Sequence, residues 1–248
     1  MGLRRFYCPE IPAPSGCVDL PASESGHALR VLRLGAGDRL VLLDGKGVRA
    51  EAELLEPERT GRRRLARCRV IRREQLPPPE PRLRLLVAPP RGKGMELILR
   101  QATEMGVWRI VPILCQYSVR QQASEPAARA GHADIVAAAK QSGNAFFPEL
   151  TAPVPFAAAI ATTPGAGYFG DTAGLAPAAP ELQADSREIS LWIGPEGGFS
   201  ATERVELLAL RQQPVCLGRW VLRVQTAVPA LLGWLMGRLD DSGRRQSP

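Results

Sequence analysis

The chain of 248 residues is poor in histidine and in paired cysteines, and each shortage excludes a class of protein. It has two histidines and five cysteines, and no two cysteines form a Cys-x-x-Cys pair. Zinc sites with the usual spacing are built from such pairs, so we expect no metal centre. Because an odd number of cysteines cannot all pair internally, we expect reduced thiols.

Long apolar runs are also missing. The first ten residues, Met1–Glu10, contain two arginines and a proline but no apolar core of a secretory leader. The most apolar helix that the pattern predicts, 226–239, is too short to span a bilayer. We therefore expect a cytoplasmic protein with no membrane partner.

Lysine is scarce, with three in the chain, whereas arginine is abundant, and the net charge is +7. Such an excess favours an acidic partner, with nucleic acid the usual one. Arginine suits phosphate and base-edge contacts, although a G+C-rich genome raises the arginine share equally well. A dense basic run in 60–73 alternates with apolar residues, which predicts a strand with one basic face; a solvated loop is the alternative.

Two patterns divide the chain into an N-terminal and a C-terminal part. Residues 1–75 contain short strand-like runs separated by Gly-Asp and Asp-Gly turns, which is typical of a small β-barrel. Residues 76–81, Leu-Pro-Pro-Pro-Glu-Pro, predict a stiff linker. In 82–240 strands alternate with helices, which predicts an α/β domain with a parallel sheet. We expect 241–248 to be a disordered tail.

The last predicted helix, 226–239, is apolar nearly all round, so it must be covered on more than one side. A subunit interface is the simplest cover. Gly233 and Gly237 form a Gly-x-x-x-Gly pattern that lets a second helix approach closely.

The most informative motif is the turn from Gly194 to Gly198, Gly-Pro-Glu-Gly-Gly. It follows an apolar run, 189–193, and precedes a helix in which Ser200 and Glu203 have the spacing of a capping box. A strand, a glycine turn and a helix N-terminus place backbone N–H groups at the sheet edge where α/β folds bind ligands. An ordinary βα connection that needs glycines for its geometry is the alternative.

Three further clusters could carry chemistry, and they lie at 91–96, 141–144 and 217–227. In 217–227 irregular chain with large apolar residues precedes a helix, and an adenosine could satisfy the polar groups of such buried backbone. The Gly-x-Gly-x-x-Gly match at 165–170 has no strand before it and no helix after it, which argues against a dinucleotide site.

Together these motifs resemble those of the bacterial 16S rRNA uracil-N3 methyltransferases (RsmE type). The resemblance rests on 93–96, 101–107, 141–143, 193–203 and 217–227, and on 5–7, 27–38 and 44–45 for a PUA-like barrel. It implies a SPOUT α/β domain with a deep trefoil knot and an S-adenosyl-L-methionine cofactor. It also implies a homodimer through the C-terminal helix and knot region. The substrate would be N3 of a specific uridine in 16S rRNA of the small ribosomal subunit.

The resemblance also implies roles for individual residues. The expected cofactor-binding residues are Gly194, Pro195, Glu196, Gly197, Gly198, Leu217, Gly218, Leu222, Thr226 and Ala227. The expected RNA-binding residues are Arg5, Arg30, Arg33, Arg62, Arg63, Arg64, Arg91, Lys93, Arg100, Gln141 and Asn144. Methylation of uracil N3 needs removal of the imide proton, so we expect Arg223 to stabilise the developing oxyanion and Glu196 or Glu104 to accept the proton. In the alternative, Glu196 caps backbone amides and Arg223 pairs with a carboxylate.

Three residues depart from the family pattern. Asn144 and Phe146 stand where the family usually has basic residues, and Gln225 stands where it has a glutamate. These departures leave two other functions open. One is a SPOUT methyltransferase for another RNA or atom, and the other is a non-catalytic RNA-binding or assembly protein.

Overall fold

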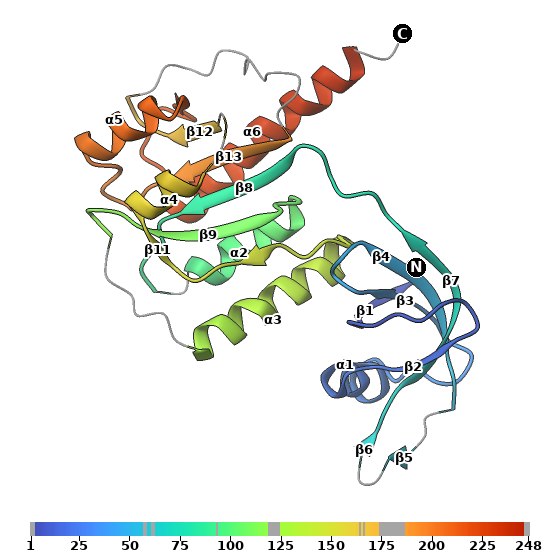
Figure 1. Cartoon of the computed structure of the whole chain (residues 1–248). Coiled ribbons are helices and arrows are strands. Elements are labelled where there is room, and N and C mark those ends of the chain that lie inside the picture. The colour runs from blue at the N-terminus through green and yellow to red at the C-terminus, as the bar shows by residue number, and fades with distance from the viewer. Residues whose placement is uncertain are drawn as a thin grey trace. The chain divides into compact units, whose positions relative to one another are not determined.

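The computed structural model describes residues 3–56, 59–60, 63–92, 94–118, 125–163, 165, 167–173 and 187–245 (Figure 1). The chain forms two compact units, of which unit 1 comprises 1–78 with 136–147 and unit 2 comprises 79–135 with 148–248. The expected division at 76–81 differs from these units at one segment, because 136–147 belongs to unit 1.

Unit 1 is built around a five-stranded sheet in the order β1-β3-β4-β7-β2. Its strands are β1 (Arg4–Tyr7), β2 (Cys17–Asp19), β3 (Arg39–Leu43), β4 (Val48–Leu54) and β7 (Arg67–Gln75). A two-stranded ribbon, β5 (Arg59–Thr60) with β6 (Arg63–Arg64), and the helical segments α1 (Ala22–Gly26) and η1 (His27–Val31) complete it. The strand-like runs of the sequence, at 18–20, 39–43, 48–55 and 65–71, correspond to β2, β3, β4 and β7, whereas none of them covers β1. Alternate residues of β4 are buried in the core, as its period of two requires.

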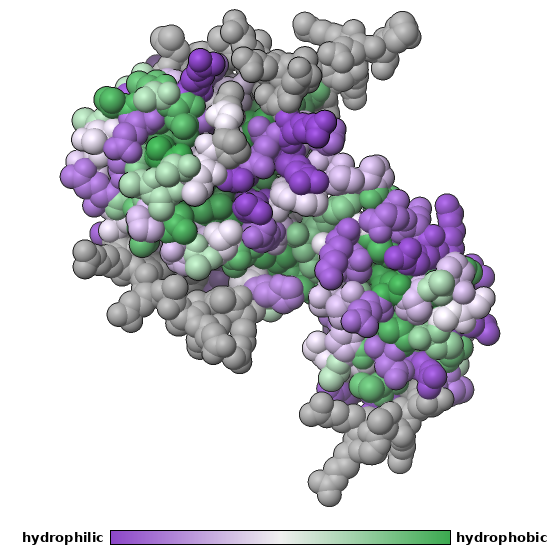
Figure 2. Space-filling model, in the orientation of Figure 1, coloured by the Kyte–Doolittle hydropathy of each residue, from purple (hydrophilic) through white to green (hydrophobic). Residues whose placement is uncertain are grey.

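The later part of the basic run at 60–73 lies on β7, where Arg69, Arg72 and Arg73 are exposed. Cys68 and Val70 point into the core, whereas Arg69 is exposed and pairs with Glu53 at 3.1 Å. Arg72 lies 3.9 Å from Glu74, so part of this positive charge is balanced within the sheet. Figure 2 shows hydrophilic residues over β4 and β7.

Two glycines explain why 136–147 joins unit 1. The Gly47 N–H donates to the Ala145 carbonyl at 2.9 Å, and the Phe147 N–H donates to the Gly45 carbonyl at 2.9 Å. A Cβ at Gly47 would stand 2.5 Å from the Phe146 ring, and a Cβ at Gly45 would stand 2.7 Å from the Phe147 ring. The turn therefore needs glycines to let both rings approach its backbone.

The C-terminal end of α3 (Glu125–Ser142) is held in unit 1 by two charged contacts. The Lys140 ammonium lies 2.8 and 3.0 Å from the two carboxylate oxygens of Glu24, a residue that is 7% exposed. The Arg5 guanidinium donates to the carbonyls of Lys140 and Gln141 at 3.1 and 2.8 Å. A cation that satisfies the last carbonyls of a helix stabilises its end.

Unit 2 contains a parallel sheet, as the sequence predicted, in the order β10-β9-β8-β13-β12-β14, with β11 also paired to β9. Its strands are β8 (Arg82–Val87), β9 (Arg109–Leu114), β10 (Glu149–Leu150), β11 (Val154–Pro155), β12 (Gly167–Gly170), β13 (Glu188–Ile193) and β14 (Gln212–Val215). Its other helices are α2 (Gly94–Glu104), α4 (Phe156–Thr162), α5 (Ala201–Ala209) and α6 (Val224–Arg245). Residues 167–170 of the Gly-x-Gly-x-x-Gly match thus form a strand. The sequence missed α4.

Strand register assigns the helices to the two faces of this sheet. Leu86, Trp192 and Phe169 stand side by side on β8, β13 and β12 and share one apolar cluster with residues of α4 and α5. Tyr168 points to the opposite face, where its ring packs edge-on against Trp234 of α6 at 5.0 Å. Helix α2 packs against α6 on that face, so both faces of the sheet are covered (Figure 1).

The prediction of a disordered tail is wrong for residues 241–245, because α6 continues to Arg245. Extending a formed helix by a few residues costs much less than starting one, so the helix does not end with its apolar stretch. Residues 246–248 lie outside the described part of the chain. Within that part, none of the helices combines the length and hydropathy that crossing a membrane requires.

Candidate functional site

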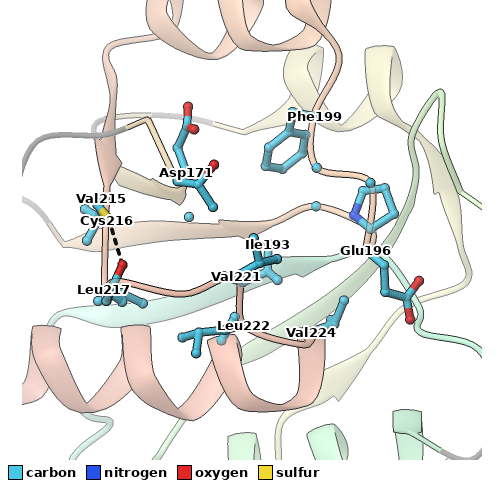
Figure 3. Close-up of a pocket in the computed structure, with 18 of the residues that line it drawn as sticks. Asp171, Ile193, Glu196, Phe199, Val215, Cys216, Leu217, Val221, Leu222 and Val224 are labelled. Carbon is cyan, nitrogen blue, oxygen red and sulfur yellow. Dashed lines mark hydrogen bonds between the residues drawn. The ribbon is translucent and has the colours of Figure 1, made fainter.

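A cavity of about 300 Å³ lies where three neighbouring strands of unit 2 end (Figure 3). Strands β12, β13 and β14 run parallel and end at Gly170, Ile193 and Val215, so their carboxyl ends meet at one sheet edge. Open α/β sheets bind ligands at this edge, and the volume falls at the low end of small-molecule sites.

Two loops supply most of the cavity wall, one after β13 and one after β14. Nine of the ten expected cofactor residues line it, namely Gly194, Pro195, Glu196, Gly197, Gly198, Leu217, Gly218, Leu222 and Ala227. Thr226 is exposed in the first turn of α6 and is not part of the lining. The structure thus brings together two segments that lie some twenty residues apart in the sequence.

Glycines in the wall leave space that the protein itself does not fill. Gly218 has no positive φ, and no atom of the described residues stands within 4 Å of where its Cβ would be. Neither the backbone conformation nor packing against the described residues therefore requires a glycine there. Gly198 likewise faces open space but has a φ of +73°, a conformation that favours glycine. Both positions allow a ligand to approach the backbone closely.

Glu203 fixes the loop after β13. The predicted capping box is present, because the Ser200 N–H donates to Glu203 Oε2 at 2.8 Å and the Glu203 N–H donates to Ser200 Oγ at 3.3 Å. Glu203 Oε1 also accepts the Gln116 N–H at 2.8 Å. One buried carboxylate thus joins the loop after β9 to the start of α5, a link between distant segments that sequence reasoning missed.

Asp171 and Arg204 are lining residues that the sequence analysis did not identify. The Arg204 guanidinium lies 2.8 Å from Asp171 Oδ2, and the Ala173 N–H donates to Asp171 Oδ1 at 2.9 Å. The Asp171 side chain is 8% exposed. The sequence could have indicated Asp171 by its position directly after β12, because a polar residue at the carboxyl end of a parallel strand lies at the edge where ligands bind.

Glu196 and Arg223, two of the three catalytic candidates, keep free charged groups. Among the described residues, no hydrogen bond or ion pair engages the Glu196 carboxylate or the Arg223 guanidinium, and both side chains are exposed. Figure 3 places Glu196 at the opposite end of the site from Leu217. Within the described part of the chain, Glu196 therefore caps no backbone amide and Arg223 pairs with no carboxylate. The carboxylate that fixes the loop after β13 is that of Glu203.

Glu104, the third candidate, is exposed and does not line the cavity. The position of a Cβ on Gly94, at the start of α2, lies 3.6 Å from Gln225 Oε1 at the start of α6. Glu104 ends the same helix, about 15 Å further along its axis at 1.5 Å per residue. The start of α2 thus lies at the start of α6, whereas Glu104 lies at the other end of the helix.

The expected RNA-binding residues fall into three groups. Arg30, Arg33, Arg64, Arg91 and Gln141 are exposed, and Arg30 and Arg64 line one groove beside α1. Three others have partners within the protein. Arg5 donates to the end of α3, Arg100 lies 2.7 Å from the Asp134 carboxylate, and Asn144 accepts the Phe146 N–H at 2.9 Å. Arg62, Lys93 and the Arg63 side chain lie outside the described part of the chain.

Alkaline pH should destabilise the fold through buried thiols. Burial raises the pKa of Cys115, in the loop after β9, from 9.0 to about 12, and that of Cys68 to about 12. At pH values between 9.0 and about 12, the unfolded chain releases thiol protons that the folded chain retains. The free energy of unfolding therefore falls as the pH rises, on the order of 1 kcal/mol per pH unit for each thiol. Urea unfolding of Cys115→Ala between pH 8 and 11 should show a smaller fall, whereas Cys17→Ala, at an exposed position, should match the wild type.

The described residues contain no cluster of three or more histidine, cysteine, aspartate or glutamate side chains able to hold a metal ion. A cavity lined by glycines lies next to a capped helix at the carboxyl edge of a parallel sheet. These features define an α/β ligand-binding domain.

Two family models match the chain. One is described as an RNA methyltransferase domain and matches residues 78–236, and the other as an RNA methyltransferase PUA domain and matches residues 20–61. Since the first model covers well over half of the sequence, the chain belongs to the RNA methyltransferase family.

Individual relatives are similar to this chain along nearly its whole length. The ribosomal RNA small subunit methyltransferase E of Synechocystis is 29% identical over 229 residues, which cover 90% of this chain and 74% of the relative. The crystal structure of the enzyme of that name from Neisseria gonorrhoeae, bound to S-adenosyl methionine, has a TM-score of 0.83 at 26% identity and covers 95% of this chain and 98% of that chain. A probable rRNA-methyltransferase from Porphyromonas gingivalis has a TM-score of 0.77 at 31% identity, with the same coverage.

Proposed function

We propose that the protein transfers a methyl group from S-adenosyl-L-methionine to N3 of a specific uridine in 16S rRNA of the small ribosomal subunit. The observation that carries the proposal is the cavity, because two segments of the resemblance, 194–198 and 217–222, meet in its wall. The relatives named as small subunit rRNA methyltransferases support the substrate class.

The cavity suits this cofactor. Gly218 and Gly198 leave backbone open in the two loops of the wall, and the apolar side chains of Ile193, Val215 and Leu222 also line the cavity (Figure 3). Main-chain groups beside apolar side chains are the usual contacts of an adenine ring in a concave site. When bound, the cofactor supplies an electrophilic methyl group.

The chain's own residues prepare the uracil for this reaction. Arg223 lies between the lining residues Leu222 and Val224 and has a free guanidinium, so it holds the oxygen that becomes negative as N3 loses its proton. Glu196 is the better placed of the two carboxylates to accept that proton, because it stands in the wall. The position of Glu104 at the far end of α2 does not favour it.

Cofactor affinity should depend on Gly198. Its φ of +73° makes alanine cost about 1 kcal/mol, and the added methyl group intrudes on the cavity. We expect Gly198→Ala to raise the Kd for S-adenosylmethionine about tenfold in calorimetry. Gly92→Ala is the matched control, since Gly92 has a φ of +67° and open space but lies outside the cavity. Equal affinities in both variants would contradict this assignment.

The substrate is tested by nucleoside mass spectrometry of small-subunit rRNA from a deletion strain. Loss of N3-methyluridine, restored by the wild-type chain, is the expected result. Persistence of that nucleoside with loss of another methylated nucleoside would favour the alternative RNA methyltransferase. The exposed arginines of unit 1, with Arg91 and Gln141, would hold the RNA by phosphate contacts in this proposal.

We also propose a homodimer through the C-terminal helix. Val228, Leu231, Leu232 and Leu235 of α6 are buried within unit 2, whereas Gly233, Met236 and Gly237 remain exposed. Trp220 and Val221, in the loop before this helix, are 77% and 76% exposed. Such adjacent apolar residues favour cover by a second protein surface. A stable monomer in small-angle scattering at micromolar concentration would contradict the dimer.

Finer features of the fold belong to the same proposal. We infer that the five-stranded sheet of unit 1 closes as a PUA-like barrel and that the C-terminal part of unit 2 forms a deep trefoil knot. Family membership supports both features. A substrate in ribosomal RNA supports a cytoplasmic location.

A further inference from the structure

Tyr117 presents an aromatic ring beside the cavity. It follows β9 and is 54% exposed, although its inner side packs on Gly197 of the cavity wall. A Cβ on Gly197 would stand 3.3 Å from Tyr117 Cβ and 3.6 Å from a ring carbon. The tyrosine thus rests directly on the backbone of the loop that lines the cavity.

The backbone on both sides of Tyr117 is fixed. The Cys115 N–H donates to Ser118 Oγ at 2.9 Å, and the Ser118 N–H donates to the Cys115 carbonyl at 3.0 Å, which closes a tight turn. The Gln116 N–H donates to the buried Glu203 carboxylate, which also caps α5. A side chain at the tip of so constrained a turn binds a partner with little loss of backbone entropy.

The surroundings of this ring indicate what it contacts. Its sequence neighbours Gln116 and Ser118 are polar, and Glu196 precedes the glycine on which it rests. A protein interface needs contiguous apolar surface, as at Trp220 and Val221, whereas the described sequence neighbours of this ring, Gln116 and Ser118, are polar. A nucleobase needs one flat aromatic face and tolerates polar neighbours.

We propose that Tyr117 is a substrate-positioning residue that stacks on an unstacked base of the RNA at the mouth of the cavity. This inference rests on the proposed function and deepens it, because it names the group that holds the base beside the methyl donor. Stacking on an aromatic ring is a general means of holding a base outside its helix. Tyr117 performs no proton transfer in this role.

The experiment compares Tyr117→Ala and Tyr117→Phe with the wild type. It measures methyl transfer into small-subunit RNA, binding of the same labelled RNA without cofactor, and S-adenosylmethionine affinity by calorimetry. Loss of one base stack should raise both the KM and the Kd for RNA about tenfold in Tyr117→Ala, with cofactor affinity unchanged. Tyr117→Phe keeps the ring and should behave as the wild type. Leu208→Ala, which removes a 52% exposed side chain from α5 outside the cavity lining, is the matched control.

Three results would overturn the stacking role. They are unchanged RNA affinity in Tyr117→Ala, a loss in Tyr117→Phe as large as in Tyr117→Ala, and weaker cofactor binding in Tyr117→Ala, which would show that the residue only supports the loop. Failure of the proposed function would give a result different from failure of the stacking role. In that case the wild type transfers no methyl group to the RNA, while the dependence of RNA binding on Tyr117 still decides the stacking role.

Discussion

Replacing Arg223 with alanine is expected to lower kcat for methyl transfer about 100- to 1000-fold, the usual cost of removing one group that stabilises a developing oxyanion. The guanidinium has no partner among the described residues, so its removal leaves no buried charge behind. The variant should therefore fold normally and keep its affinity for S-adenosylmethionine. Single-turnover transfer from labelled cofactor into small-subunit RNA measures the effect.

Two further variants separate catalysis from general electrostatics. Arg219→Ala removes another exposed arginine of the same loop, which like Arg223 stands between two lining residues, and it should change kcat less than threefold. Arg223→Lys keeps the charge but loses the planar fork, so it should recover part of the rate. If Arg223→Ala weakened RNA binding and left kcat unchanged, Arg223 would be a phosphate contact.

Local signals predicted several helices and strands because each of these depends on neighbouring residues. The apolar run before Gly194 forms β13, and Ser200 and Glu203, three residues apart, form the capping box at the start of α5. Gly143 follows α3 with a φ of +85°, as a glycine that ends a helix often does. A strand, a turn and a cap are encoded within a few residues, so one sequence reveals them.

Contacts between distant residues could not be predicted in this way. The second bond of Glu203 goes to Gln116, and the turn at Gly45 and Gly47 receives Phe146 from 99 residues further on. No local pattern marks either partner, because nothing in the sequence around Gln116 or Phe146 distinguishes a residue that contacts a distant segment from one that does not. The position of 136–147 in unit 1 follows from such contacts, so only the folded chain shows it.

The departures from the family pattern acquire different meanings in the structure. Asn144 Oδ1 accepts the Phe146 N–H, and the Phe146 ring covers Gly47, so both residues serve the packing of unit 1. Gln225 differs, because its Oε1 is buried at the start of α6 with no hydrogen-bond partner among the described residues. A buried carbonyl oxygen that lacks a donor costs stability. Of the three departures, Gln225 is also the one that directly follows a residue of the cavity wall, Val224.

Replacing Lys140 with methionine is expected to lower the free energy of unfolding of unit 1 by about 3–5 kcal/mol. The substitution keeps the apolar stem but leaves the Glu24 carboxylate buried, with the Tyr7 N–H at 3.1 Å as its remaining donor among the described residues. Removing one partner of a buried ion pair is strongly destabilising for this reason. Urea denaturation gives the free energy. Arg69→Met, which breaks the exposed pair with Glu53, should cost less than about 1 kcal/mol.

A double variant tests whether charge burial causes this loss. Glu24→Gln with Lys140→Met removes both charges and keeps a polar group beside the Tyr7 N–H. Because the cost in the single variant comes from an uncompensated buried carboxylate, the double variant should regain most of the lost stability. A double variant as unstable as Lys140→Met alone would show that the ammonium holds α3 through its geometry. In that case no apolar substitution at position 140 could keep 136–147 docked in unit 1.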